Sequence, residues 1–314
     1  MTGLPTLAVS GVTGHLGGLV ARQLSAAGVP LRLLARSPER APVLPDCPVV
    51  ELSYGDSPAA RTALAGVEVL FMVSAAESVD RLDVHRGLVD AAVAAEVQQV
   101  VYTSFVAASP HSTFTLGRDH GATEQHIEAA GLAFTFLRDN FYLDFLPAVA
   151  GTDGVIGGPA GDGRLAAVAR ADVARCATAV LQQPSAHRGQ RYDLTGPEAL
   201  SLDDAARIIT EVTGRPTTYH DETVPEAYAS RAVYQAPDWQ VDAWVSTYTA
   251  IATGELAAVS DNVRQLTGRA PVGLREVLTG SDHVPSTSAS TRSDTPGRAA
   301  CRLRSVQILR EGRP

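Results

Sequence analysis

The sequence predicts an α/β fold, a doubly wound parallel sheet followed by a smaller, mostly helical C-terminal lobe. Two observations favour this fold. Short apolar runs alternate with amphipathic segments through the first half of the chain, as in parallel strands joined by helices. Beyond residue 194, helical segments follow one another with short loops between them. With 314 residues, 45% of them hydrophobic, the chain can bury a sizeable core.

The first forty residues read as strand, glycine turn, helix and strand. Apolar runs at 7–9 and 31–34 flank three glycines and an amphipathic segment. Gly11 permits a tight turn, Gly14 lets the backbone approach a pyrophosphate, and Gly17 lets the helix pack on the sheet. This order is typical of a Rossmann-type dinucleotide site. The residues expected to bind the cofactor here are Gly11, Val12, Thr13, Gly14, His15, Leu16 and Gly17.

Arg36, at the end of the second strand, indicates which dinucleotide is bound. An NAD site usually has Asp or Glu there, whereas the next acid in this chain is Glu39. A guanidinium suits a 2′-phosphate because its planar fork makes bidentate, charge-assisted bonds. We therefore expect NADP(H), the alternative being a solvated arginine. The missing acid also argues against an FAD site, and no flavin motif is visible.

The chain contains no lysine, since all 26 basic residues are arginine. Many short-chain dehydrogenases use a Tyr-x-x-x-Lys pair, in which lysine lowers the pKa of the tyrosine. That mechanism is excluded here.

Further strands are expected at 49–52, 67–73, 97–103, 133–138 and 191–194, with helices at 83–95 and 119–130. Ser201 and Asp204 resemble a capping box that opens a helix ending at Gly214, and Pro225 suits the first turn of another. We expect an NADP-binding core at 1–150, the remaining strands and a substrate lobe at 151–280, and a disordered tail at 281–314.

Polar and aromatic residues follow the strands, at the sheet edge where such folds bind ligands. Each of these residues could equally have a structural or a functional role. The prediction of a ligand site rests on their lying together at one edge of the sheet. The candidates for the cofactor are Asp56, Ser74, Ala75, Arg138, Asn140, Phe141 and Tyr142, and Ser104 is a catalytic candidate.

His120 is the second catalytic candidate. It follows Asp119, a candidate helix cap, and Glu124 lies one turn further on the same face. An imidazole with an ordinary pKa could donate a proton to a reduced oxygen at neutral pH. The alternative is a histidine hydrogen-bonded locally at a helix start.

Several motifs together resemble the NmrA-like group of atypical short-chain reductases, in particular its type 2 NAD(P)H:quinone oxidoreductases. They are Gly11-x-Thr13-Gly14-x-x-Gly17 with Arg36, Tyr102-Thr103-Ser104, Asp119-His120-Gly121-Ala122-Thr123-Glu124 and Leu137-Arg138-Asp139-Asn140-Phe141-Tyr142. The resemblance implies NADPH bound by the glycine turn, Arg36 and the segment after the sixth strand. Related benzylic ether reductases have a catalytic lysine where this chain has His120, so their chemistry is not expected and the proton donor is left open.

The expected function is hydride transfer from NADPH to a quinone or a similar planar conjugated carbonyl. The alternative is a non-catalytic redox sensor that binds NADP(H) and regulates a partner, as some NmrA-like proteins do.

Charge and composition limit the kinds of partner that the protein is expected to bind. A net charge of −8 argues against nucleic acid, and no apolar stretch reaches the roughly 18 residues needed to span a membrane. Three dispersed cysteines and eight scattered histidines predict neither disulfides nor a metal site, which favours a reducing cytoplasm. The oligomeric state is left open, a homodimer included.

Overall fold

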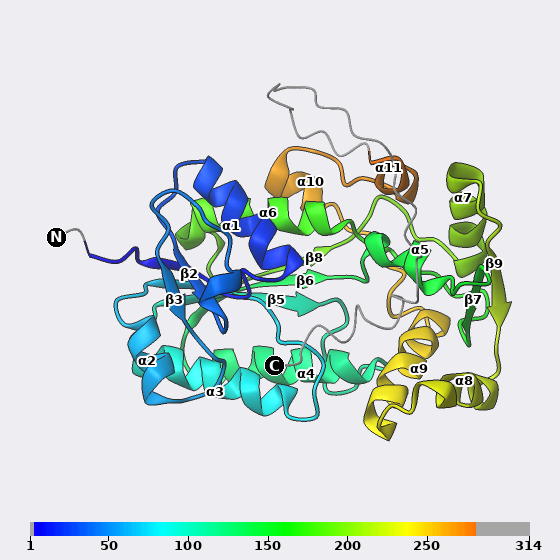
Figure 1. Ribbon diagram of the computed structural model, residues 1–314, viewed down its shortest axis with the longest axis horizontal. Coiled ribbons are helices and arrows are strands. Elements are labelled where there is room, and N and C mark those ends of the chain that lie inside the picture. The colour runs from blue at the N-terminus through cyan, green and yellow to red at the C-terminus, as the bar shows by residue number, and fades with distance from the viewer. Residues whose placement is uncertain (1–2, 281–314) are drawn as a thin grey trace.

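Seven parallel strands form the central sheet of the protein (Figure 1). The computed structural model describes residues 3–280, so the predicted tail at 281–314 lies outside the described residues. The strand order is β3-β2-β1-β4-β5-β6-β8. The strands are β1 (Leu7–Val9), β2 (Arg32–Ala35), β3 (Val49–Glu51), β4 (Val69–Met72), β5 (Gln99–Phe105), β6 (Ala133–Asp139) and β8 (Gln190–Leu194). This order confirms the predicted doubly wound sheet.

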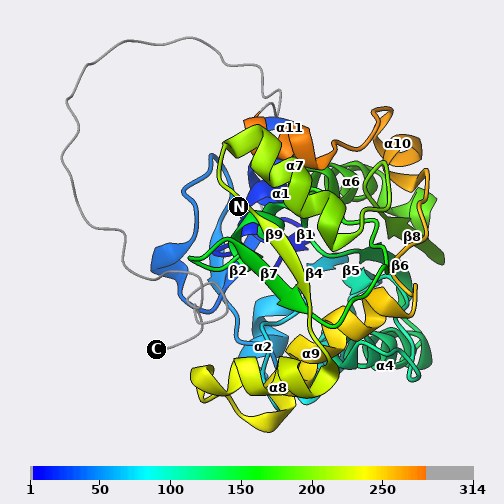
Figure 2. The same ribbon diagram turned by 90° about the vertical axis from the view of Figure 1, so that its right-hand side faces the viewer.

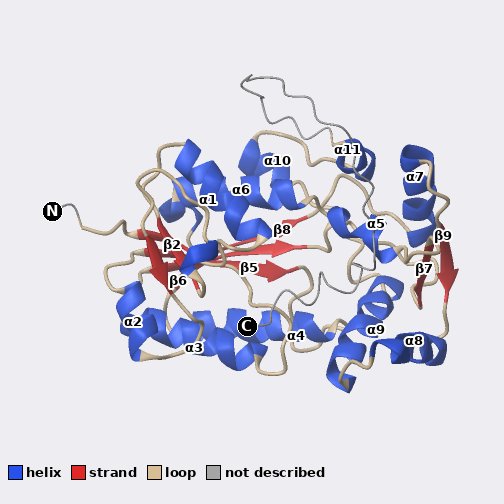
Figure 3. Ribbon diagram, viewed as in Figure 1, coloured by secondary structure: helices blue, strands red, loops and turns tan. Residues whose placement is uncertain are grey.

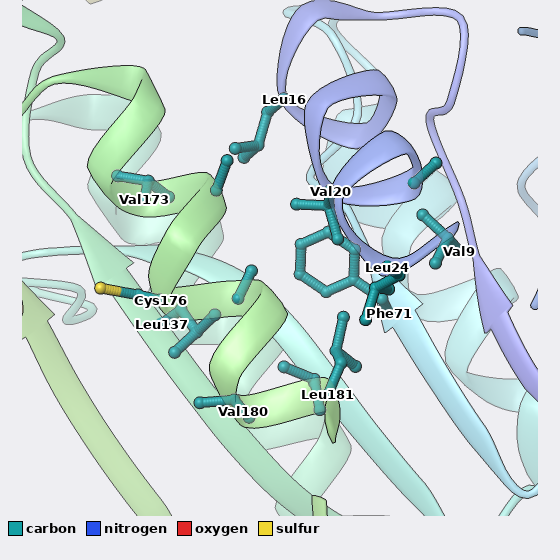
Figure 4. Close-up of a cluster of buried hydrophobic side chains, with 14 of the residues drawn as sticks. Val9, Leu16, Val20, Leu24, Phe71, Leu137, Val173, Cys176, Val180 and Leu181 are labelled. Atoms are coloured by element: carbon teal, nitrogen blue, oxygen red, sulfur yellow. The ribbon is translucent and has the colours of Figure 1, made fainter. Parts of the chain in front are cut away.

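Helices cover both faces of the sheet (Figure 1). One face carries α1 (His15–Ala26), α6 (Arg170–Gln182) and α10 (Asn262–Thr267). The opposite face carries α2 (Pro58–Leu64), α3 (Arg81–Ala94) and α4 (Thr115–Ala129). Figure 4 shows Val20 of α1 and Val180 of α6 among the buried side chains that join the first layer to Phe71 of β4. The second layer has its own apolar cluster around Tyr102 and Phe136.

A smaller lobe stands beyond the carboxyl ends of the strands (Figures 1 and 2). Its helices are α5 (Leu146–Val149), α7 (Leu202–Thr213), α8 (Val224–Arg231), α9 (Asp238–Ala252) and α11 (Leu274–Thr279). Short 3₁₀ turns occupy Pro38–Arg40, Leu143–Phe145, Pro184–His187 and Ala232–Tyr234. Helices dominate the lobe, as predicted (Figure 3).

The lobe also contains a two-stranded parallel sheet that the sequence analysis did not predict. It pairs β7 (Val155–Gly158) with β9 (Thr218–Asp221). Each strand is four residues long, and about sixty residues separate them, so neither shows a recognisable alternating pattern.

The caps predicted for the lobe are confirmed. Ser201 and Asp204 form a capping box at the start of α7, and Gly214 ends that helix with a φ of 70°. Pro225 lies in the first turn of α8.

The predicted start of the helix before β6 is wrong. That helix, α4, begins at Thr115, so Asp119 lies inside it and caps nothing. The Thr115 N–H donates to the Ser246 hydroxyl of α9 at 3.1 Å, so a distant side chain satisfies the helix start in place of a local cap.

No helix within residues 3–280 combines the length and apolarity needed to cross a membrane.

Candidate functional site

A ligand crevice is expected where the chain direction reverses across the sheet, between β1 and β4. The chain runs outward from β1 through β2 to β3, and then returns to β4 on the other side of β1. The connections on the two sides cover opposite faces, so the carboxyl ends of β1 and β4 border a crevice. A dinucleotide here would have its adenine half over β1–β3 and its nicotinamide half over β4–β6.

The glycine turn has the geometry that a pyrophosphate requires. Gly11 has a φ of +63°, which favours glycine. A Cβ on Gly17 would lie 2.7 Å from the Ser10 carbonyl oxygen, and closer still to that of Gly11, so only glycine fits. No side chain within residues 3–280 caps the N-terminus of α1, and its first turn carries no acid. The turn therefore presents backbone amides to an anion, and it fits the phosphates of NADP(H).

The turn residues differ in what they expose. Val12 and Leu16 are buried in the core between α1 and α6, so only their backbone can face a ligand. Thr13, Gly14 and His15 are exposed.

Arg36 lies exposed directly after β2. Among residues 3–280 it has no hydrogen bond or ion pair, so its guanidinium is free to meet a 2′-phosphate.

Asp56, expected near the adenine, is held by a neighbour. Arg61 donates two hydrogen bonds to its carboxylate, at 2.7 and 2.5 Å, and these bonds lower the pKa of Asp56. The cap of α2 is Ser57, which accepts from the Ala60 N–H, so Asp56 does not serve as the cap.

Tyr54 reaches from the end of β3 to the crevice and was missed by the sequence analysis. Its hydroxyl lies 2.5 Å from the Ser10 hydroxyl and donates to the Val73 carbonyl at 2.7 Å. The Val73 N–H in turn donates to Ser10. These contacts join the ends of β1, β3 and β4, and burial raises the pKa of Tyr54.

The segment after β4 is held by buried side chains. The Ser74 N–H donates to the Thr103 hydroxyl at 2.8 Å, and the Ala75 N–H donates to His85 Nε2 at 2.8 Å. The Ala75 carbonyl accepts from Arg81 Nε at 3.0 Å. Ser74 and Ala75 therefore present a fixed backbone along the crevice.

Arg81 also fixes His120. Its Nη2 donates to His120 Nε2 at 2.9 Å, so Nε2 is an acceptor and the proton of the neutral ring lies on Nδ1. That Nδ1–H donates to the Tyr102 hydroxyl at 2.9 Å. His85 has the same tautomer, because its Nε2 accepts from the Ala75 N–H.

The expected ordinary pKa of His120 is wrong. Burial and the nearby Arg81 charge lower it well below the usual value, and the same two causes lower the pKa of His85 to about 3. Both rings are neutral at neutral pH. His120 is 6% exposed and its Nε2 is occupied by Arg81, so in this arrangement it aligns neighbouring groups.

Ser104 and Arg138 share one partner beneath the crevice. Ser104 is fully buried and donates to Glu124 at 2.5 Å. Arg138 makes a bidentate ion pair with the same carboxylate, at 2.8 and 2.5 Å. The structure thus directs both side chains to α4, whereas the sequence analysis expected them to meet a ligand.

Asn140 also differs from expectation. Its Nδ2 donates to the Leu256 carbonyl at 3.0 Å, and its Oδ1 accepts from the Phe141 N–H at 2.8 Å. Both ends of the amide are occupied, so Asn140 ties the end of β6 to the lobe. Phe141 packs against Phe105 and Phe114, with ring centroids 5.1 and 5.2 Å away.

Tyr142 lies beside the α1–α6 core, on the face that carries the glycine turn. Its hydroxyl donates to Asp139, and Arg170 of α6 covers its ring at 4.9 Å. Asp139 is 8% exposed, and burial raises its pKa to about 7 against the opposing effects of Tyr142, Arg81 and Arg170. A carboxyl that titrates near neutrality therefore lies at the end of β6.

The lobe contains a cavity of about 560 Å³ between the α5–β7 segment and helices α8 and α9. Trp244 and Tyr248 of α9 line it together with Tyr234, whereas Val245 of the same helix is buried. Helix α9 thus both packs the lobe and supplies an aromatic wall. Within residues 3–280, no cluster of His, Cys, Asp or Glu is arranged to hold a metal ion.

Comparison with known proteins identifies the cofactor. A family model described as NAD(P)H-binding matches residues 11–184. The chain is 31% identical to quinone oxidoreductase 2 of Escherichia coli over 277 residues, covering 86% of this chain and 96% of the relative. It is also 31% identical to the NAD(P)H azoreductase of Xenophilus azovorans, covering 83% of this chain and 92% of the relative.

The fold matches solved structures as well. The NADPH complex of the E. coli quinone oxidoreductase superimposes with a TM-score of 0.81, covering 88% of this chain and 99% of that one. The negative transcriptional regulator NmrA in complex with NADP gives a TM-score of 0.68 at 18% identity, covering 88% and 95%. The second match shows a shared fold alone.

Proposed function

The chain belongs to the NAD(P)H-binding, NmrA-like oxidoreductases, and from this we propose that it transfers a hydride from NADPH to a quinone or a similar planar conjugated carbonyl. The observation that carries the proposal is the aromatic cavity of the lobe. A flat ring suits walls made of Trp244 and Tyr248. The names of the quinone and azo-dye reductases support the same class of acceptor.

The cofactor is proposed to lie along the carboxyl ends of the strands. The amides of the glycine turn from Gly11 to Gly17 would hold the pyrophosphate, and Arg36 would hold the 2′-phosphate. The fixed backbone of Ser74 and Ala75 would border the nicotinamide half. Phe141 and Tyr142 would form the opposite border. When bound, NADPH supplies the hydride.

The chain's own residues orient the reactants without a Tyr-Lys pair, since no lysine is present. Arg81 holds Ala75 and His120 in place from one buried guanidinium. Glu124 holds Ser104 and Arg138 beneath the same edge. Rate enhancement then comes from proximity and a fixed geometry.

The redox-sensor alternative is not favoured by any observation. The reductases match at 31% identity, whereas the regulator shares the fold at 18%.

NADPH consumption by the pure protein tests the function. A panel of benzoquinones and naphthoquinones is offered, with NADH in parallel and a control without acceptor. We expect acceptor-dependent oxidation that favours NADPH. Tight NADPH binding with no consumption across the panel would refute quinone reduction.

A further inference from the structure

Helix α9 of the lobe contacts the segments that follow β4 and β5. The Ser246 hydroxyl of α9 accepts from the Thr115 N–H, at the start of the helix that follows β5. Gln240 and Trp244 of the same helix lie beside the carboxyl of Glu77, in the segment after β4. Glu77 comes two residues after Ala75, on the side of the crevice expected to hold the nicotinamide.

Two polar atoms at this junction are buried and form no hydrogen bond of normal geometry with any residue in the described range, 3–280. They are Oε2 of Glu77 and Nε1 of Trp244. A buried donor or acceptor left unpaired costs roughly 1–3 kcal/mol, so each such atom needs an explanation. Both atoms lie where the segment after β4 meets helix α9 of the lobe.

The environment of Glu77 favours its protonated form. Burial raises the pKa of this carboxyl. Gln240, Trp244 and the charge of Arg81, the groups that face it from α9 and α3, oppose that effect without cancelling it. A ring that excluded water from the junction would raise the pKa further.

Trp244 connects this junction to the aromatic cavity of the lobe. Its ring lines the cavity, with the Tyr234 ring edge-on at 5.8 Å. The cation in its wall, Arg231, already donates to Glu222 and to the carbonyls of Ala227 and Gly157. That guanidinium is therefore already engaged, whereas Trp244 Nε1 beside Glu77 forms no hydrogen bond of normal geometry within residues 3–280.

We propose that Glu77 and Trp244 bind the carbonyl oxygen of the acceptor, and that the Glu77 carboxyl is the acid that protonates it. This inference rests on the proposed function and names the acceptor's binding site and the proton donor. The acceptor receives the hydride, with its electron pair, from NADPH. As negative charge develops on the oxygen, Trp244 N–H donates to it, and the O–H bond of Glu77 breaks as the new O–H bond forms. The carboxylate then regains a proton from water.

The chain offers a direct test of acceptor binding. It contains two tryptophans, so Trp239→Phe leaves Trp244 as the only tryptophan. This variant is titrated with 1,4-naphthoquinone in the presence of NADP⁺. We expect saturable quenching of the Trp244 fluorescence. Quenching that rises only linearly with quinone concentration, in a variant that retains turnover, would overturn the site.

Glu77→Gln tests the proton donor, with Glu68→Gln as the matched control. Glu68 is exposed and precedes β4, at the opposite end of the sheet. In the native protein kcat should fall about tenfold per pH unit above the pKa of Glu77, because only the protonated form is active. Glu77→Gln should lower kcat at least about 10-fold at low pH and abolish this pH dependence, with NADPH affinity unchanged. A native pH profile in Glu77→Gln would overturn the acid role.

The two measurements separate this inference from the proposed function. Saturable quenching without NADPH oxidation by any quinone would reject the reductase and support the binding site. Oxidation with linear quenching would support the reductase and reject the site.

Discussion

The two halves of the crevice differ in the kind of chemical group that lines them. The half over β1–β3, here called the backbone half, consists of the glycine turn and one exposed cation, Arg36. The half over β4–β6, here called the titratable half, consists of buried titratable side chains from separate elements, among them Arg81, His120 and Asp139. The first half offers backbone amides and a guanidinium to a ligand. The second half contains groups whose charge depends on burial, so its stability and chemistry should depend on pH.

Asp139→Asn should give the largest effect, in the titratable half. Its carboxyl has a pKa of about 7 in the folded protein, against about 4 in an unfolded chain. The folded state thus holds the proton more tightly, and stability is lost as pH rises from about 4 to about 7. The cost above pH 7 is at most roughly 4 kcal/mol.

Because Asn cannot ionise, the difference in unfolding free energy between Asp139→Asn and the native protein should grow in favour of the variant over that range. It should then level off. Urea unfolding at pH 5, 6, 7 and 8 measures it. A difference independent of pH would mean that Asp139 titrates normally.

Gly17→Ala should give the next largest effect, in the backbone half. The added methyl group would collide with the carbonyls of Ser10 and Gly11, and the turn must shift to accommodate it. NADPH affinity should fall at least about 100-fold, because the amides of the turn would no longer converge on the phosphates.

Fluorescence titration with NADPH measures the affinity, with Ser25→Ala near the end of the same helix as the control. Circular dichroism checks the fold. An unchanged NADPH affinity in Gly17→Ala would contradict the contrast between the two halves, because the backbone geometry of the turn would then not be needed for binding.

The same contrast explains what the sequence could predict. The glycine turn, Arg36 and the alternation of strands and helices follow from local patterns, because a turn needs its glycines at fixed spacing. The titratable half depends on contacts between residues far apart in the chain. His120 and Arg81 are 39 residues apart, and Asn140 and Leu256 are 116 apart.

The failed expectations share this cause. Ser104 and Arg138 are the next-to-last residues of β5 and β6, near the strand ends where ligand-binding residues lie, but each binds Glu124 instead. The start of α4 was misplaced because Ser246, 131 residues away, satisfies the Thr115 N–H. The Arg81–His120 contact joins two helices, and nothing in the sequence pattern of either helix names the other residue as its partner.

Arg36→Ala should give a smaller effect, and it tests what Arg36 contributes to cofactor binding in the backbone half. Loss of the free guanidinium should weaken NADPH binding about 10-fold and leave NADH binding nearly unchanged, because only NADPH carries the 2′-phosphate. Affinities for both cofactors measure the effect, with the exposed Arg40→Ala as the control. Equal weakening of both cofactors would indicate a general electrostatic role for Arg36.

Ser104→Ala should have the smallest effect. This variant distinguishes a structural role of the Ser104 hydroxyl in the titratable half from a catalytic one. The serine hydroxyl is one of three donors to Glu124, and Arg138 supplies the other two. Its loss should cost about 1 kcal/mol of unfolding free energy, since the carboxylate keeps its ion pair. It should also leave kcat for quinone reduction within about twofold, because a fully buried hydroxyl directed to α4 has no route to the acceptor. Urea unfolding and steady-state kinetics on the same preparation measure both quantities. A large fall in kcat with native stability would instead place the Ser104 hydroxyl in the reaction, and the buried half of the crevice would have to open for the acceptor to reach it.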